Sequence, residues 1–157
     1  MNQRNWKTYF LWVILSEAAG MIAGALSRDG MLAFLQSGAQ SPLSPPPVVF
    51  PLVWTALYVL MGIGMAQVQL YGDGNTGKAR NLFLIQLGVN FLWPLIFFNA
   101  QAYGLALLWL LLLLILVLAT TLEFRQQYPQ AGLLQIPYLL WLCFAAVLNF
   151  SVFLRSN

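Results

Sequence analysis

Histidine is absent from this chain of 157 residues, and Cys143 is its single cysteine. These counts exclude a disulfide framework, a Cys/His metal site and a nucleophile activated by histidine. Acidic residues are also scarce: there are four, and only Glu17 lies deep inside an apolar stretch. A pair of carboxylates of the kind that glycosidases and aspartic proteases use is therefore excluded. The sequence predicts no catalytic residue, no metal site and no cofactor, and it favours a protein that is not an enzyme.

Charged residues make up only 7% of the chain, while hydrophobic residues make up 61%. A soluble domain of this length does not tolerate such a composition. Predominantly apolar stretches of about 20 residues, enough to cross a bilayer as a helix, can be drawn at residues 9–26, 48–70, 82–100, 102–122 and 131–154, with a long first loop at 27–47. The sequence therefore predicts an all-α integral membrane protein, in which residues 1–157 form a single domain, a bundle of five transmembrane helices.

Basic residues are divided unevenly between the two predicted ends of this bundle. The end that holds the N-terminus carries Arg4, Lys7, Lys78, Arg80 and Arg125, and the other end carries Arg28 and Arg155. Because basic residues favour the cytoplasmic side, this asymmetry predicts a cytoplasmic N-terminus. The net charge of +3 suits anionic lipid headgroups. The basic residues form no stripe along one surface, so we expect membrane lipid and no nucleic acid as a partner.

Polar side chains interrupt the third predicted span. Gln86, Asn90 and Trp93 are spaced i, i+4 and i+7, which places them on one face of a helix. An unpaired amide in hydrocarbon costs several kcal/mol, so such a face usually points into a bundle interior or a cavity. Two explanations carry equal weight at this point. Asn90 and Trp93 either border a ligand cavity or hold helices together through hydrogen bonds.

The first predicted span contains an acid and a face of small residues. An ionised carboxylate near the bilayer core is costly unless it is paired, so we expect Glu17 to be neutral and to point into the bundle, bonded to an amide or hydroxyl of another helix. The equally weighted alternative is a shallow position that reaches headgroup water. Gly20 and Gly24, one turn apart, predict a close helix contact. Such a contact favours a retained helix over a cleaved signal peptide, which the segment Ala23-Gly24-Ala25 would also fit.

Two further spacings suggest a pocket for an amphipathic ring. Trp141, Ala145 and Leu148 are spaced i, i+4 and i+7, so a small residue between two bulky ones leaves a notch where a flat ring could lie. Trp54 and Tyr58 form an i, i+4 pair of aromatic rings with polar tips.

The remaining aromatic residues have more ordinary explanations. Tryptophan and tyrosine in membrane proteins mostly mark the interface with water, and we expect this position for Trp6, Trp12, Tyr71, Tyr128 and Tyr138. Trp109 lies in a leucine-rich run and is expected to face lipid or to pack between helices, and Asn149 is expected to join two helices rather than to contact a ligand.

Three blocks of sequence resemble one known family of membrane proteins. They are Pro45-Pro46 followed by VFPLVWTALYVLMG (49–62), QLGVNFLWPLIFF (86–98) and PYLLWLCFAAVLNF (137–150), and Gly20 and Gly24 match paired glycines of the family's first helix. On these blocks the chain resembles the translocator protein and tryptophan-rich sensory protein family, also called peripheral benzodiazepine receptors. The resemblance implies a five-helix bundle, often a homodimer, whose cavity binds porphyrins, cholesterol-like lipids and synthetic benzodiazepine-site ligands.

Carried over residue by residue, the resemblance implies a set of ligand-binding residues from the second, third and fifth spans. They are Val49, Phe50, Trp54, Asn90, Trp93, Phe98, Trp141, Phe144, Ala145 and Leu148. The chain departs from the family in its first loop, where Leu43, Val48 and Phe34 stand at positions that usually hold tryptophan. This departure weakens the case for the light-driven porphyrin degradation attributed to some relatives, for which Trp141 is the main remaining candidate.

Three functions remain open from the sequence. The leading one is a membrane-embedded receptor or carrier that binds a flat hydrophobic ligand, with a porphyrin preferred and a sterol-like lipid less favoured, in a transport or sensory role. The alternatives are a membrane enzyme that degrades porphyrin by light or oxidation, and a scaffold whose polar residues only hold helices together. The resemblance and the brevity of the chain favour a bacterial cell membrane, with an outer membrane as the alternative.

Overall fold

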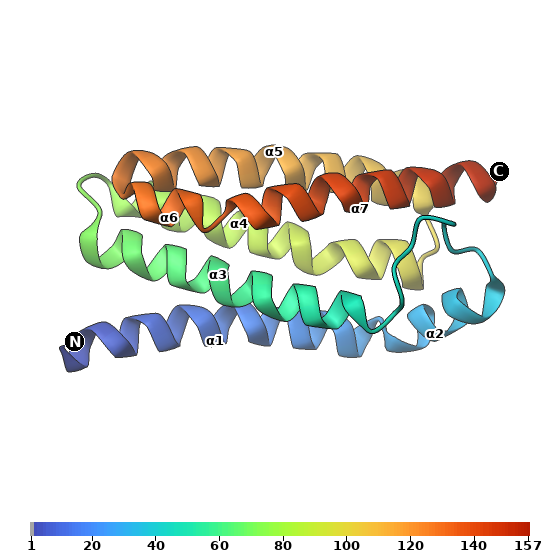
Figure 1. Cartoon of the computed structure of the whole chain (residues 1–157), viewed down its shortest axis with the longest axis horizontal. Coiled ribbons are helices and arrows are strands. Elements are labelled where there is room, and N and C mark those ends of the chain that lie inside the picture. The colour runs from blue at the N-terminus through green and yellow to red at the C-terminus, as the bar shows by residue number, and fades with distance from the viewer. Residues whose placement is uncertain (1) are drawn as a thin grey trace.

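The computed structural model describes residues 2–157, and every regular element among them is a helix (Figure 1). In chain order these are α1 (Gln3–Leu26), α2 (Arg28–Ser37), α3 (Val49–Tyr71), α4 (Thr76–Pro94), the π-helical turn η1 (Leu95–Asn99), α5 (Tyr103–Gln127), α6 (Pro129–Leu133) and α7 (Ile136–Arg155). Within the described residues, five segments are long and apolar enough to span a membrane: α1, α3, α4 with η1, α5, and α6 with α7. The predicted all-α fold with five spans is confirmed, and the protein is an integral membrane protein.

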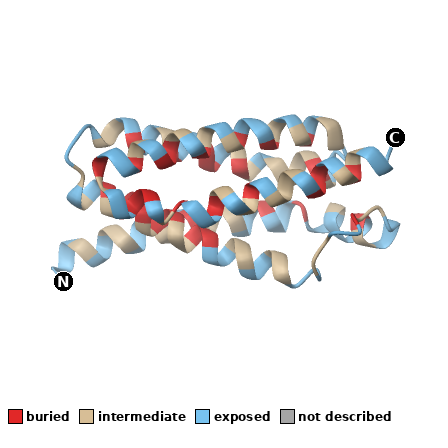
Figure 2. Ribbon diagram, turned by 45° about the horizontal axis from the view of Figure 1, so that its top comes forward, coloured by how far each residue is buried: buried red, intermediate tan, exposed pale blue. Residues whose placement is uncertain are grey.

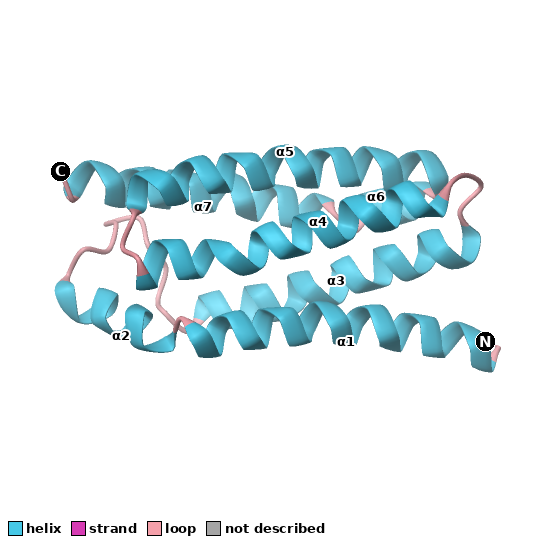
Figure 3. Ribbon diagram, turned by 180° about the vertical axis from the view of Figure 1, so that it is seen from behind, coloured by secondary structure: helices cyan, strands magenta, loops and turns pink. Residues whose placement is uncertain are grey.

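The five spans form one bundle of alternating direction, so the N-terminus and the C-terminus lie at opposite ends (Figure 1). Helix α1 packs against α3, and α5 packs against both α4 and α7. The view from behind shows the long helices side by side, with the connections gathered at the two ends (Figure 3). Buried residues follow the inner faces (Figure 2), while large apolar side chains such as Phe10, Leu108 and Ile115 are exposed on the outside. Such an outer surface suits a surrounding lipid phase.

Helices extend beyond several of the boundaries expected from hydropathy. Helix α1 begins at Gln3 rather than at residue 9, and α4 begins at Thr76 rather than at 82. At both starts an asparagine side chain accepts a hydrogen bond from the first turn: Asn2 from the Arg4 N–H at 3.4 Å, and Asn75 from the Gly77 N–H at 2.9 Å. Hydropathy locates the part of a helix that lies in hydrocarbon. A capped helix continues past it, because water and cap residues satisfy its terminal groups.

The first loop is not wholly irregular, which corrects the expectation for residues 27–47. It contains α2, whose Phe34 is buried and whose end is marked by Gly38 in the left-handed conformation, with a φ of 72°. The prolines of this loop, among them residues 45–47, indicate its irregular part. The helical spacing of Met31, Phe34 and Leu35 is the sequence signal for α2. Helix α2 packs against η1 and covers the end of the bundle opposite the N-terminus (Figure 1).

Prolines shape the third and fifth spans. After Pro94 the third span continues as a π-helical turn, in which the Ala100 N–H donates to the Leu95 carbonyl at 3.0 Å. In the fifth span a break at Leu134–Gln135 separates α6 from α7, which begins just before Pro137. A proline lacks the N–H that a regular helix needs at that point, so the chain widens or breaks its hydrogen-bond ladder there. The fifth span is thus two helices rather than the single helix expected.

Helices α1 and α3 approach each other closely at glycines. A Cβ added at Gly62 would lie 2.5 Å from the Val13 Cα, and a Cβ at Gly20 would lie 2.7 Å from the Tyr58 Cδ2 and closer still to Cε2. The close helix contact expected at Gly20 is confirmed. This contact brings the middle of α3 against α1 and fixes one wall of the site described next.

Candidate ligand-binding cavity

A cavity of about 460 Å³ lies at the end of the bundle that holds α2 and the first loop. Its walls come from α1, α2, the first loop, α3, α4, η1, α5 and α7. Exposed residues at its rim, among them Met21, Pro47 and Thr55, show that it is open to the outside rather than sealed. Its volume lies within the range of roughly 300–1,000 Å³ that small-molecule sites in proteins occupy.

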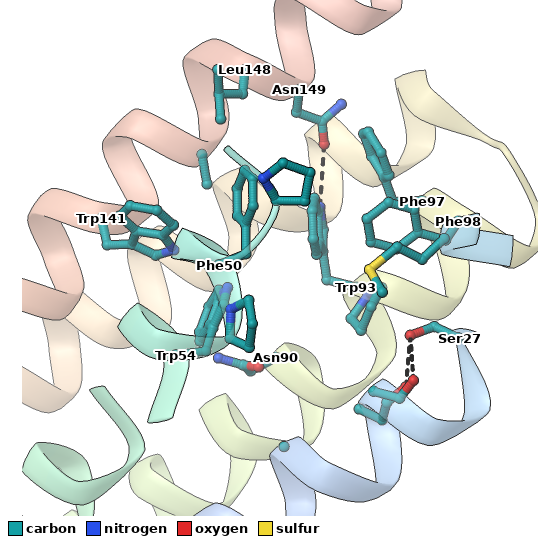
Figure 4. Close-up of a pocket in the computed structure, with 18 of the residues that line it drawn as sticks. Ser27, Phe50, Trp54, Asn90, Trp93, Phe97, Phe98, Trp141, Leu148 and Asn149 are labelled. Carbon is teal, nitrogen blue, oxygen red and sulfur yellow. Dashed lines mark hydrogen bonds between the residues drawn. The ribbon is translucent and has the colours of Figure 1, made fainter. Parts of the chain in front are cut away.

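Aromatic side chains dominate the walls of this cavity. The ring centroids of Phe50 and Trp141 are 5.8 Å apart (Figure 4), and those of Trp54 and Tyr58 are 5.6 Å apart. The wall around η1 is completed by Phe34, Trp93, Phe97 and Phe98, with centroid distances between 4.8 and 6.1 Å. The π-helical turn accounts for part of this arrangement, because it lets two consecutive residues, Phe97 and Phe98, both border the cavity.

The structure brings together most of the residues that the sequence proposed for ligand binding. Those bordering the cavity are Phe50, Trp54, Asn90, Trp93, Phe98, Trp141, Ala145 and Leu148. Val49 is not among the lining residues, and neither is Phe144, whose ring instead packs 5.4 Å from that of Trp141. Ala145 lies between Trp141 and Leu148 on the wall, as their helical spacing requires.

A chain of buried hydrogen bonds crosses the bundle beside the cavity. The Tyr58 hydroxyl donates to the Asn90 Oδ1 at 2.8 Å, and the Asn90 Nδ2 donates to the Tyr138 hydroxyl at 2.5 Å. The Tyr138 hydroxyl in turn donates to the Gln86 Oε1 at 2.9 Å, and the Gln86 Nε2 lies 3.9 Å from the Met61 sulfur. Asn90 and Gln86 therefore join α3, α4 and α7. Asn90 also borders the cavity, so the two explanations of this residue are not exclusive.

Two residues expected at the water interface are instead buried in the bundle, and the expectation for them was wrong. Tyr138 is 1% exposed and takes part in the chain of hydrogen bonds just described. Trp12 is 6% exposed, and its indole Nε1 donates to the Gln69 Oε1 at 2.6 Å. Partners on other helices satisfy the polar tips of both side chains, so neither needs the interface.

Other polar contacts join helices around the site. The Trp93 Nε1 donates to the Asn149 Oδ1 at 3.2 Å (Figure 4), and the Asn149 Nδ2 donates to the Tyr103 carbonyl at 2.9 Å. The helix-joining role expected for Asn149 is confirmed. Trp109 packs between helices, with its Nε1 donating to the Val89 carbonyl at 2.8 Å.

Two polar atoms of the cavity wall are buried and, within the part of the chain that the structure describes, have no hydrogen-bond partner. One is the indole Nε1 of Trp141, which Figure 4 shows on the side of the ring that faces Phe50. The other is the Oε1 of Glu17. The amide or hydroxyl partner expected for Glu17 is therefore not found, although the side chain does border the interior. Unpaired buried polar atoms are uncommon in proteins and call for an explanation.

Sequence reasoning missed several residues of the wall. Gly24 was expected in a helix contact, but a Cβ added there would meet nothing within 4 Å among the described residues, and Gly24 borders the cavity. Phe34, which the sequence marks only as a substitute for a loop tryptophan, is buried and borders the cavity. Its place follows from α2, so the helical spacing within the first loop was the signal that could have identified it.

Comparison with known proteins gives a consistent result. The sequence profile of the TspO/MBR family matches residues 12–155 of this chain. The Tryptophan-rich protein TspO of Archaeoglobus fulgidus is 34% identical over 144 residues, which cover 91% of this chain and 94% of that protein. The human Translocator protein is 38% identical over 147 residues, covering 91% of this chain and 86% of its own length. The Tryptophan-rich sensory protein of Cereibacter sphaeroides is 40% identical over 115 residues, covering 73% and 70%. With its five spans and its family-specific blocks in order, the chain belongs to the TspO/MBR family.

Proposed function

We propose that this protein is a membrane-embedded receptor or carrier for flat, hydrophobic ring ligands, with a tetrapyrrole as the preferred ligand. The observation that carries the proposal is an open cavity of about 460 Å³ whose aromatic walls include the indole N–H of Trp141, which has no hydrogen-bond partner among the described residues. The names of its relatives, Translocator protein and Tryptophan-rich sensory protein, agree with a role in transport or sensing. No covalent chemistry is needed for such a role.

The shape of the wall supports a planar ligand. Ala145 is a small residue between two bulky ones on α7, Trp141 and Leu148, so its position forms a notch in the wall of the cavity that Phe50 and Trp54 of α3 also border. A flat ring in this notch would stack against aromatic faces and remove their apolar surface from lipid or water. Offset or edge-to-face contacts between aromatic rings add about 0.5–1.5 kcal/mol per pair beyond the burial itself.

The polar groups of the wall differ in their availability to a ligand. Asn90 and Trp93 are engaged, since Asn90 bonds two tyrosines and the Trp93 indole bonds Asn149. The Trp141 Nε1 has no partner in residues 2–157 and faces Phe50. The Phe50 ring lies edge-to-face with Trp141, at a centroid distance of 5.8 Å, so a carbonyl or carboxylate oxygen of a ligand would accept this hydrogen bond after the Phe50 ring turns aside. Trp141 is therefore the donor that we propose for ligand recognition.

The same residue gives the enzymatic alternative one specific site to test. If the protein degraded porphyrin under light, an indole next to the bound ring would have to take part, and Trp141 borders the cavity. Trp54 and Trp93 also border it. Illumination of the porphyrin-loaded protein would give a product, and Trp141→Phe would abolish it. A carrier would return the porphyrin unchanged.

The test of the proposal is a porphyrin titration of the protein in nanodiscs, followed through the Soret absorption of the porphyrin. Binding is expected to saturate, and Trp141→Phe is expected to weaken it about three- to tenfold, the value of one hydrogen bond. Trp6→Phe serves as the matched control, because Trp6 is exposed at the far end of α1. A signal no larger than that of empty nanodiscs would refute the proposal and leave the scaffold alternative. Equal effects of the two variants would refute only the role of Trp141.

We further propose a homodimer in a bacterial cell membrane with the N-terminus in the cytoplasm. The basic residues of the bundle end that holds the N-terminus, among them Lys78 and Arg80 after the α3–α4 loop, support this orientation. The exposed apolar face of α1, which includes Phe10 and Ile14, offers a surface for a second copy. The cavity would then open at the opposite, non-cytoplasmic end of the bundle.

A further inference from the structure

Glu17 is the only charged side chain among the described residues that line the cavity. The lining includes no lysine and no arginine, and the Glu17 Oε1 has no hydrogen-bond donor within residues 2–157. A carboxyl group in such surroundings has no internal partner for its charge. A ligand that brought a positive charge or a strong donor would supply what the protein itself does not.

Glu17 shares one face of α1 with two glycines, and the space beside the second of them leaves room for that partner. Glu17, Gly20 and Gly24 are spaced i, i+3 and i+7, and all three border the cavity. Gly20 is in contact with the Tyr58 ring, but the space beside Gly24 is open. The open space on this helix face therefore lies about two turns from the acid.

The cavity that Glu17 lines also has aromatic walls, which suit a cation. Trp54 and Tyr58 lie on α3, the helix that packs against α1, and Trp93 lies on α4. The faces of tryptophan and tyrosine rings attract organic cations within about 6 Å of the ring centre, an interaction worth roughly 0.5–2 kcal/mol and most when water is excluded. Methyl groups on a nitrogen also suit these apolar walls. A cavity lined by a carboxyl group and several aromatic rings is thus a complementary site for an alkylated amine.

We propose that the cavity binds lipophilic amines, with Glu17 as the partner of the amine nitrogen and the aromatic walls as the partner of its alkyl and ring groups. This inference rests on the proposed function only in that the cavity accepts a ligand, and it adds a class of ligand that a porphyrin-binding surface alone does not require. Binding requires no proton beyond the one that Glu17 or the amine already carries. A neutral amine and a protonated Glu17 share one proton, which lies on either atom, so the bound pair adds no net charge to the membrane interior.

The experiment compares two molecules of the same shape in nanodiscs by isothermal titration calorimetry, with empty nanodiscs subtracted. The first is N,N-dimethyl-1-(naphthalen-2-yl)methanamine, and the second is 2-isobutylnaphthalene, in which a CH group replaces the nitrogen. The proteins are the wild type, Glu17→Gln and Glu123→Gln. Glu123 serves as the matched control because it undergoes the same change from carboxyl to amide outside the cavity, on α5, where it pairs with Lys78 at 3.3 Å.

The amine is expected to bind the wild type in a saturable way, and Glu17→Gln is expected to weaken it at least tenfold while changing the binding of 2-isobutylnaphthalene less than twofold. Glu123→Gln should leave the binding of both ligands within twofold of the wild type. The inference is overturned if the wild type binds the amine no better than the hydrocarbon, or if Glu17→Gln weakens both ligands equally. A porphyrin titration of the same preparations separates the two proposals. Retained porphyrin binding with no preference for the amine refutes this inference alone, and loss of all binding by the wild type refutes the proposed function as well.

Discussion

Gly20 and Gly24 lie one turn apart on α1, and alanine should have opposite effects at the two positions. A Cβ at Gly20 would lie 2.7 Å from the Tyr58 Cδ2, whereas ordinary contacts begin at 3.4 Å, so the Tyr58 ring must retreat by more than half an ångström. Tyr58 is 7% exposed, and its hydroxyl donates to Asn90 at 2.8 Å, so the ring has little freedom to move. At Gly24 an added Cβ meets nothing within 4 Å in the described residues.

The magnitude follows from comparing the two variants. Replacing glycine by alanine within a helix is worth about 0.5–1 kcal/mol in favour of alanine, and this gain is common to both positions. Overpacking at Gly20 costs about 1–3 kcal/mol, a cost that Gly24 does not share. Gly20→Ala should therefore be less stable than Gly24→Ala by about 1–3 kcal/mol. Gly24→Ala itself should be as stable as the wild type or slightly more stable.

The measurement is unfolding of each purified variant by SDS in mixed micelles, followed by far-ultraviolet circular dichroism. A second comparison tests the cause: in a Tyr58→Leu background, the extra cost of Gly20→Ala should largely disappear, because the ring that it collides with is gone. Equal stabilities of Gly20→Ala and Gly24→Ala would refute the packing that we describe between α1 and α3. A cost at Gly20 that persists without the Tyr58 ring would place its origin elsewhere.

Two further predictions concern polar contacts. Tyr138→Phe removes a hydroxyl that bonds both Asn90 and Gln86. Hydrogen bonds within membranes average about 0.6 kcal/mol each, so we expect the variant to lose about 1 kcal/mol of stability in the same SDS titration. Tyr128→Phe, whose hydroxyl contact is exposed, should lose less, and an equal loss would contradict the structural role of the buried chain of hydrogen bonds. Lys78→Met removes an ion pair with Glu123, in which the charged atoms are 3.3 Å apart and Lys78 is 66% exposed. Stability should therefore change by less than about 0.5 kcal/mol. A larger loss in about 0.15 M salt would show that solvent and salt screen the pair less than the exposure of Lys78 indicates.

The contrast between predicted and observed positions is clearest for the polar residues of the spans. The i, i+4 spacing placed Gln86 and Asn90 on one helix face, and both are buried inside the bundle. Their actual partners, Tyr58 and Tyr138, lie on other helices, and nothing local in the sequence pairs them. Tyr138 was assigned to the interface because single tyrosines usually lie there, and the assignment failed because a buried acceptor was available on α4.

The residues of the cavity show a similar division. Trp141, Ala145 and Leu148 share a face of α7 by their spacing, and the structure has all three on the cavity wall. Glu17 was expected to find a donor on another helix, because a membrane-embedded carboxyl group usually does. Whether a donor is within reach depends on how far apart the helices stand at that depth, and within residues 2–157 the Glu17 Oε1 has none, while the space beside Gly24 on the same helix face is open.

By itself, the sequence determined the environment of this protein, the number of its spans and the polar face of its third span. These properties follow from composition and from spacing along single helices, because hydrocarbon requires every exposed backbone group to be bonded within a helix. Only the tertiary structure decided that α2 covers one end of the bundle, that Asn90 bonds two tyrosines, and that Trp141 and Glu17 stand unpaired at an open cavity within residues 2–157. Those features depend on distances between helices, and side chains that are far apart in the sequence set such distances jointly.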